Sequence, residues 1–133
     1  MRRTDQRRDA VFALYQRQVR GGELDEILNG AKPFARQLAH GTLERQESLD
    51  AEISRLAKGW DLDRIAALER NIMLVALYEM RHREDVPTEV AIDEAVKLAR
   101  EYCGADAPKF VNGILGAAAR EQGADPAQGE ATA

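Results

Sequence analysis

Residues 86–116 read VPTEVAIDEAVKLAREYCGADAPKFVNGILG and predict two amphipathic helices folded against each other. Apolar residues of the first helix recur at the i, i+3, i+4, i+7 spacing of one buried face, and charged residues occupy the other. The buried face is formed by Ile92, Ala95, Val96, Ala99, Tyr102 and Cys103. The second helix carries a similar stripe of Ala107, Phe110, Val111, Ile114, Leu115 and Ala118. The segment therefore predicts a helical hairpin.

The boundaries of this hairpin are marked by residues typical of helix ends. Thr88 is expected to cap the first helix, Gly104 to end it with left-handed geometry, and Asp106 to cap the second. Gly113 and Gly116 each cost a helix about 1 kcal/mol relative to alanine. They predict that another helix lies close against this backbone.

The remaining sequence is also helical in pattern, and no alternating Val, Ile or Thr run typical of a strand occurs. Helices are expected at about residues 4–20, 23–28, 33–58, 63–67 and 69–82. Inward-facing positions are expected to include Ala10, Val11, Leu14, Val19, Leu49, Ile53, Leu56 and Trp60. Residues 72–78 are apolar nearly all round, so the 69–82 helix is predicted to be the central, most buried one.

Composition indicates one domain. The chain has 133 residues, 44% of them hydrophobic, which is enough for a single core. We expect residues 1–121 to form this domain and residues 122–133, which lack periodicity, to be a disordered tail. The longest apolar run is far shorter than the roughly 20 residues that span a membrane, and no secretion signal follows the first charges. We therefore expect a cytoplasmic protein without membrane contact, in which Cys103 is a buried structural thiol.

The formal net charge of −4 is unevenly distributed. The first 20 residues contain two aspartates and six arginines, a local charge of +4, so the remainder carries −8. The arginines are Arg2, Arg3, Arg7, Arg8, Arg17 and Arg20. Arginine offers a planar fork to phosphate oxygens, so a basic arm on an acidic body is typical of polyanion binding. Solvated arginines at a chain end explain the pattern equally well.

Catalytic motifs are poorly represented. Glu79 and His82 have the Glu-x-x-His spacing of di-iron bundles, but such a centre needs a second unit. The only other histidine, His40, has Gln37 at the matching position. Neither phosphate-binding glycine loops nor a GxSxG nucleophile motif occurs. We expect no enzyme, no metal and no cofactor.

Four segments carry a family resemblance: AVFALYQ at 10–16, GWDLDRIAALERNIMLVALYEM at 59–80, DVPTEVAIDEAVKLAREY at 85–102 and KFVNGIL at 109–115. In this combination and order, over residues 7 to about 118, the chain resembles the NusB family of bacterial transcription antitermination factors. The resemblance implies an all-α protein of about seven helices in two subbundles, without enzymatic activity.

The resemblance also implies partners. Family members bind the boxA element of ribosomal RNA transcripts together with NusE, a small-subunit ribosomal protein, in the RNA polymerase antitermination complex. By position, the implied RNA contacts are Arg2, Arg3, Arg7, Tyr15, Asp106, Lys109 and Phe110, and Glu69 falls among partner-facing residues. Unpaired bases stack on aromatic and arginine planes, which suits Tyr15 and Phe110. From periodicity alone, however, Phe110 is a core residue and Asp106 is first a helix cap.

Two departures from the family pattern stand out. Thr4 and Asp5 dilute the arginine arm, and Leu74 occupies a position where the family often has arginine. Two alternatives remain open. One is a helical domain related to those preceding the catalytic part of some ribosomal RNA cytosine methyltransferases, although no methyltransferase region follows residue 118. The other is a protein-binding scaffold or homodimer whose arm pairs with an acidic surface.

Overall fold

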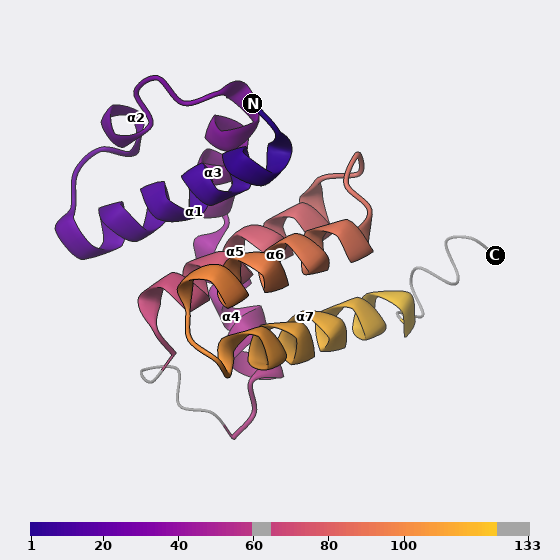
Figure 1. Ribbon diagram of the computed structural model, residues 1–133. Coiled ribbons are helices and arrows are strands. Elements are labelled where there is room, and N and C mark those ends of the chain that lie inside the picture. Colours follow the sequence, from indigo (N-terminus) through magenta and orange to yellow (C-terminus); the bar gives the residue numbers. More distant parts are fainter. Residues whose placement is uncertain (60–64, 125–133) are drawn as a thin grey trace.

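The computed structural model describes residues 1–59 and 65–124, and within them every regular element is an α-helix. The helices are α1 (Arg3–Arg20), α2 (Leu24–Ile27), α3 (Pro33–Glu44), α4 (Gln46–Leu56), α5 (Ala67–His82), α6 (Thr88–Tyr102) and α7 (Ala107–Ala124). Helices α1 to α3 gather on one side of the molecule and α4 to α7 on the other (Figure 1). For the described residues, the predicted all-α class with seven helices in two subbundles is confirmed.

Helix α5 is the centre of the core. All residues from 71 to 80 are buried, and the helix packs against α1, α3, α4, α6 and α7 (Figure 1). A helix that is apolar nearly all round is stable in water only when neighbours cover it on every side. The central position predicted for this helix is confirmed.

Helices α6 and α7 form the predicted hairpin, and Gly104 ends α6 with a φ of +77°. Thr88 is the first helical residue rather than the cap, because Pro87 takes the N-cap position. Tyr102 is not inward-facing as expected. Its side chain is 38% exposed, and its ring meets the edge of Phe12 on α1, with ring centroids 4.9 Å apart.

The first helix matches its predicted range, but Val19 is 57% exposed instead of inward-facing. The reason is that all residues from 16 to 23 are exposed, so the end of α1 projects beyond its packing partners. Ala10, Val11 and Leu14, earlier in the helix, are buried as predicted.

The single helix expected over residues 33–58 is wrong. It is divided into α3 and α4 at Arg45, whose backbone has φ −112° and ψ 15°. The division lets α3 pack against α1 while α4 packs against α5 and α7. Leu49 and Ile53 are nevertheless buried as predicted.

Other expectations fall partly outside the described residues. Of the short helix predicted at 63–67, residues 63 and 64 lie outside the described range, as do Trp60 and the tail from 125 onward. Residues 65 and 66 are not helical, and Ala67 begins α5, so the described part of this prediction is wrong. Helix α7 continues to Ala124, three residues past the expected end of the domain.

Close backbone packing occurs at a glycine that the sequence did not single out. A Cβ atom on Gly41 of α3 would lie 2.1 Å from Cζ of Tyr78, so the tyrosine ring of α5 passes directly over the α3 backbone. At Gly113, by contrast, no described atom outside its own helix would lie within 4 Å of a Cβ, and at Gly116 the nearest is Nη1 of Arg120, at 3.4 Å. The expectation that a helix covers these two glycines is wrong for the described residues.

We predict that Gly41→Ala destabilises the protein by about 1–3 kcal/mol, because the new methyl group overpacks the contact with Tyr78. Gly113→Ala is the matched control and should stabilise by up to about 1 kcal/mol, since alanine favours the helix. Urea unfolding followed by circular dichroism measures both. Equal effects of the two changes would contradict the packing described.

Candidate nucleic-acid interface

The arginine arm at the start of α1 is held against the turn between α5 and α6. Arg3 donates from Nη2 to Oδ2 of Asp85 at 2.9 Å, and the hydroxyl of Thr4 donates to Oε1 of Glu94 on α6 at 3.0 Å. The partners are 82 and 90 residues away in sequence. The arm therefore has a defined position on the body of the protein.

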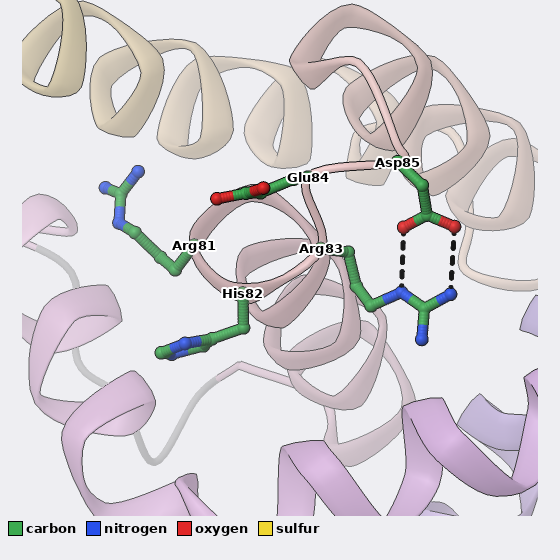
Figure 2. Close-up of a pocket in the computed structure, with 5 residues that line it drawn as sticks. All are labelled: Arg81, His82, Arg83, Glu84 and Asp85. Atoms are coloured by element: carbon green, nitrogen blue, oxygen red, sulfur yellow. Dashed lines mark hydrogen bonds and ion pairs between the residues drawn. The ribbon is translucent and has the colours of Figure 1, made fainter.

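The α5–α6 turn supplies a second arginine to the same carboxylate. Arg83 donates from Nε to Oδ1 of Asp85 and from Nη2 to Oδ2, both at 3.0 Å, as Figure 2 shows. Its Nη1 donates to Oε1 of Gln37 on α3 at 2.7 Å. The hydrogen bonds from Arg83 and Arg3 lower the pKa of Asp85 to about 2, so this carboxylate is ionised at neutral pH.

An aromatic ring lies beneath these cations. The guanidinium carbons of Arg3, Arg7 and Arg83 lie 4.1, 5.2 and 5.2 Å from the ring centroid of Phe34, at the start of α3. Cations within about 6 Å of an aromatic face are attracted by its quadrupole. Phe34 is itself buried, so it supports the arginines from below. We call Arg3, Phe34, Arg83 and Asp85 the arginine cluster.

Arg7 has a different environment from Arg3. Its Nε lies 2.9 and 3.0 Å from the two carboxylate oxygens of Glu79, and its side chain is only 5% exposed. Burial raises the pKa of Glu79, and the contact with Arg7 opposes that shift. The enclosure and the ion pair give Arg7 a positioning role at the start of α1. The RNA contact expected of Arg7 from the sequence stays a prediction.

Residues on the other side of the α5–α6 turn point away from the cluster. Figure 2 shows Arg81, His82 and Glu84 projecting opposite to the Arg83–Asp85 pair. Partial burial and the charges of Arg45 and Arg81 lower the pKa of His82 below its usual value. Among the described residues no group of three or more His, Cys, Asp or Glu side chains is arranged to hold a metal ion. The Glu79–His82 spacing thus reflects a buried ion-pair residue followed by an exposed helix end.

A strip of aromatic and basic residues runs along α1 from the arm. Arg8, Phe12 and Tyr15 are spaced i, i+4, i+7 and share one face of the helix. On this face Phe12 meets the exposed ring of Tyr102. Tyr15, one of the predicted RNA contacts, is half-buried. We call these four residues the α1 strip.

The remaining predicted site residues come together in a groove at the far end of α5. Glu69, Asp106, Lys109 and Phe110 all line this cavity of about 1150 Å³, together with residues of α4, of α7 and of the turn between α6 and α7. Burial raises the pKa of Glu69 above its usual range. Glu69 and Arg83 are 14 positions apart, so at 1.5 Å per residue the groove and the cluster are separated by roughly 20 Å. We call this cavity the α5–α7 groove.

Several residues at these surfaces escaped the sequence interpretation. The sequence does not single out Arg83 and Asp85, because helix-end charges are usually solvated, or Phe34, because its environment depends on residues far away in sequence. The available signal was the run of charged residues at 81–85 directly after an apolar helix. Such a run indicates where a buried helix reaches the surface.

A sequence profile of the NusB family matches residues 4–120 of the chain. The transcription antitermination protein NusB of Bacillus subtilis (strain 168) is 41% identical over 121 residues, which cover 86% of this chain and 92% of that protein. The protein of the same name from Heliobacterium modesticaldum is 47% identical over 95 residues, or 71% of this chain. That match spans 46% of the Heliobacterium protein, so it covers about half of this relative's length.

Solved structures give the same result for the fold. T. maritima NusB is similar with a TM-score of 0.84 and 35% sequence identity, over 91% of this chain and 92% of that one. A chain in a structure described as a crystal structure of a plectonemic RNA supercoil has a TM-score of 0.81 and 27% identity, over 92% of this chain and 97% of that one. Within the described residues, no helix of this fold is both long and apolar enough to cross a membrane.

We predict that Arg7→Ala destabilises the protein by about 3–5 kcal/mol, because it leaves the buried carboxyl group of Glu79 without the cation that pairs with it. Arg17→Ala, on the exposed end of the same helix, is the charge-matched control and should change stability little. Denaturant unfolding of both variants provides the measurement. An Arg7 variant as stable as the control would refute the positioning role.

Proposed function

The chain belongs to the NusB family of transcription antitermination proteins, and on that basis we propose that it binds boxA-type RNA of ribosomal RNA transcripts together with NusE. In this role it joins the RNA polymerase antitermination complex in the cytoplasm and suppresses premature termination. It recognises RNA by binding and not by catalysis, and needs no cofactor.

The arginine cluster is the observation that carries this proposal. Arg3 is 46% exposed, is held in place by Asp85, and lies over the ring of Phe34. Arg2 precedes it, also exposed, at the N-cap of α1. Guanidinium groups match the geometry of phosphate oxygens, so an exposed arginine at this position suits a phosphate contact. These features support the cluster as a phosphate-binding surface.

The α1 strip offers aromatic rings on which the unpaired bases of the RNA can stack. Proteins that bind single-stranded RNA combine a basic track for the backbone with aromatic faces on which bases stack. Arg8, Phe12, Tyr15 and Tyr102 offer both along one helix face, starting beside the arm. We place the RNA along α1 from the arginine cluster toward the α5–α7 groove.

The α5–α7 groove is the proposed contribution of the second subbundle. Lys109 lies exposed in the first turn of α7, where a helix N-terminus favours anions. Phe110 and Asp106 lie beside it as further RNA contacts, and Glu69 faces the protein partner. NusE and RNA would then meet at the end of α5 that is distant from the arm.

We predict that replacing both Arg2 and Arg3 by alanine weakens boxA binding about tenfold and reduces the slope of log affinity against log salt by about 1.4, or about 0.7 for each phosphate contact with a single strand. The reason is that two phosphate-binding cations are lost. Fluorescence anisotropy with labelled boxA and scrambled RNA, with and without NusE, at several salt concentrations, measures both quantities.

The control removes Arg17 and Arg20, which are equally exposed at the other end of α1. This variant should bind boxA as the wild type does. The wild type should prefer boxA over scrambled RNA, and more so with NusE. Equal or absent binding of both RNAs under every condition would overturn the proposal and favour a protein-binding scaffold or homodimer.

A further inference from the structure

We propose that Asp85 is an internal competitor of RNA phosphate in the arginine cluster, and that it sets RNA selectivity by lowering affinity for RNA of arbitrary sequence. This inference rests on the proposed function, because it assumes that the cluster receives phosphates. An acidic residue within a basic surface thereby takes part in the recognition of RNA.

The geometry of Asp85 is that of an anion already bound. Both carboxylate oxygens receive the fork of Arg83, and Oδ2 also receives Nη2 of Arg3. A phosphate would use the same paired N–H donors in the same plane. Because its pKa is about 2, Asp85 carries its charge at every pH at which RNA binding is measured.

The two arginines are bound to Asp85 to different degrees. Arg83 directs its Nε and Nη2 to Asp85 and its Nη1 to Gln37, and its side chain is 19% exposed. Arg3 directs Nη2 to the same carboxylate and is 46% exposed, as is nearly half of Asp85. Exposed ion pairs of this kind are weak, so an incoming phosphate can displace Asp85 from Arg3. The ion pair between Asp85 and Arg83 then stays formed.

This exchange penalises RNA that binds through phosphates alone. A phosphate that takes an arginine from Asp85 must approach a fixed negative charge, and it releases fewer counterions than one that meets a free arginine. RNA whose bases also stack on the α1 strip gains additional binding energy, whereas arbitrary RNA gains little. Selectivity therefore arises from weakened binding of the wrong sequences.

A purely structural role for Asp85 makes the opposite prediction. If Asp85 served only to fix the arm and the turn, its removal would free Arg3 and weaken RNA binding. If it competes, its removal strengthens binding. Glu84 provides the matched control, because it is the neighbouring exposed acid and points away from Arg83 in Figure 2.

The experiment compares the full-length wild type with Asp85→Asn and Glu84→Gln, using a labelled twelve-residue uridine oligomer and boxA RNA at several salt concentrations. Asp85→Asn should bind the uridine oligomer at least about fivefold tighter and raise the salt slope by about 0.7, the value for one further phosphate contact with a single strand. Glu84→Gln should change affinity less than twofold. Asp85→Asn that binds no tighter than Glu84→Gln would overturn the proposal.

A measurement on the wild type covers the case in which Asp85→Asn fails to fold. The Nε–H signal of Arg3 or Arg83 in an NMR spectrum should shift as the uridine oligomer is added, and unchanged signals at saturation would also overturn the proposal. Failure of the proposed function would give a different result. The wild type would then bind boxA and scrambled RNA equally, whatever the affinity of Asp85→Asn for the uridine oligomer.

Discussion

Helix α5 has almost no face that water can solvate, and the architecture follows from the need to cover it. Helices α1 and α3 cover it from one subbundle, and α4, α6 and α7 from the other. Burial of large apolar side chains is the dominant favourable term in folding, so this shared helix joins the two groups more strongly than any surface contact. Its ends are then the places where polar residues must leave the core.

Both proposed RNA surfaces lie at these ends. At the C-terminal end, the buried Glu79 binds Arg7 and so fixes the direction in which α1 starts, while Arg83 and Asp85 meet Arg3 just outside the core. At the N-terminal end, Glu69 borders the α5–α7 groove. Arg3 and Arg7 of the arm are thus each paired with an acid of the body. This pairing explains how a chain with net charge −4 keeps a basic site in place.

The sequence was sufficient for the features that depend on local periodicity. The all-helical class, the α6–α7 hairpin with its turn at Gly104, and the buried central helix all follow from the 3.6-residue repeat. The break at Arg45 was not predictable, because local propensity there permits one continuous helix and tertiary packing decides against it. The contact of Gly41 with Tyr78 was missed for the same reason, since it joins two helices whose register the sequence does not state.

At the candidate nucleic-acid interface, too, features that depend on contacts between distant residues could not be predicted. Charge asymmetry pointed to the arginine arm, and the family resemblance supplied the residues of the groove. Neither separates Arg3 from Arg7, which share a helix face but differ completely in exposure. That difference depends on Glu79 and Asp85, which lie more than 70 positions later in the chain.

These long-range contacts also have a consequence for biosynthesis. Arg3, Thr4 and Arg7 leave the ribosome before their partners Asp85, Glu94 and Glu79, which are made 72 to 90 residues later. At translation rates of about 5–20 residues per second, the arm exists for several seconds without the surface that orders it. During that interval Arg3 and Arg7 lack the acids that pair with them, and the arm takes its defined position only when α5 and α6 have been made and have packed against α1.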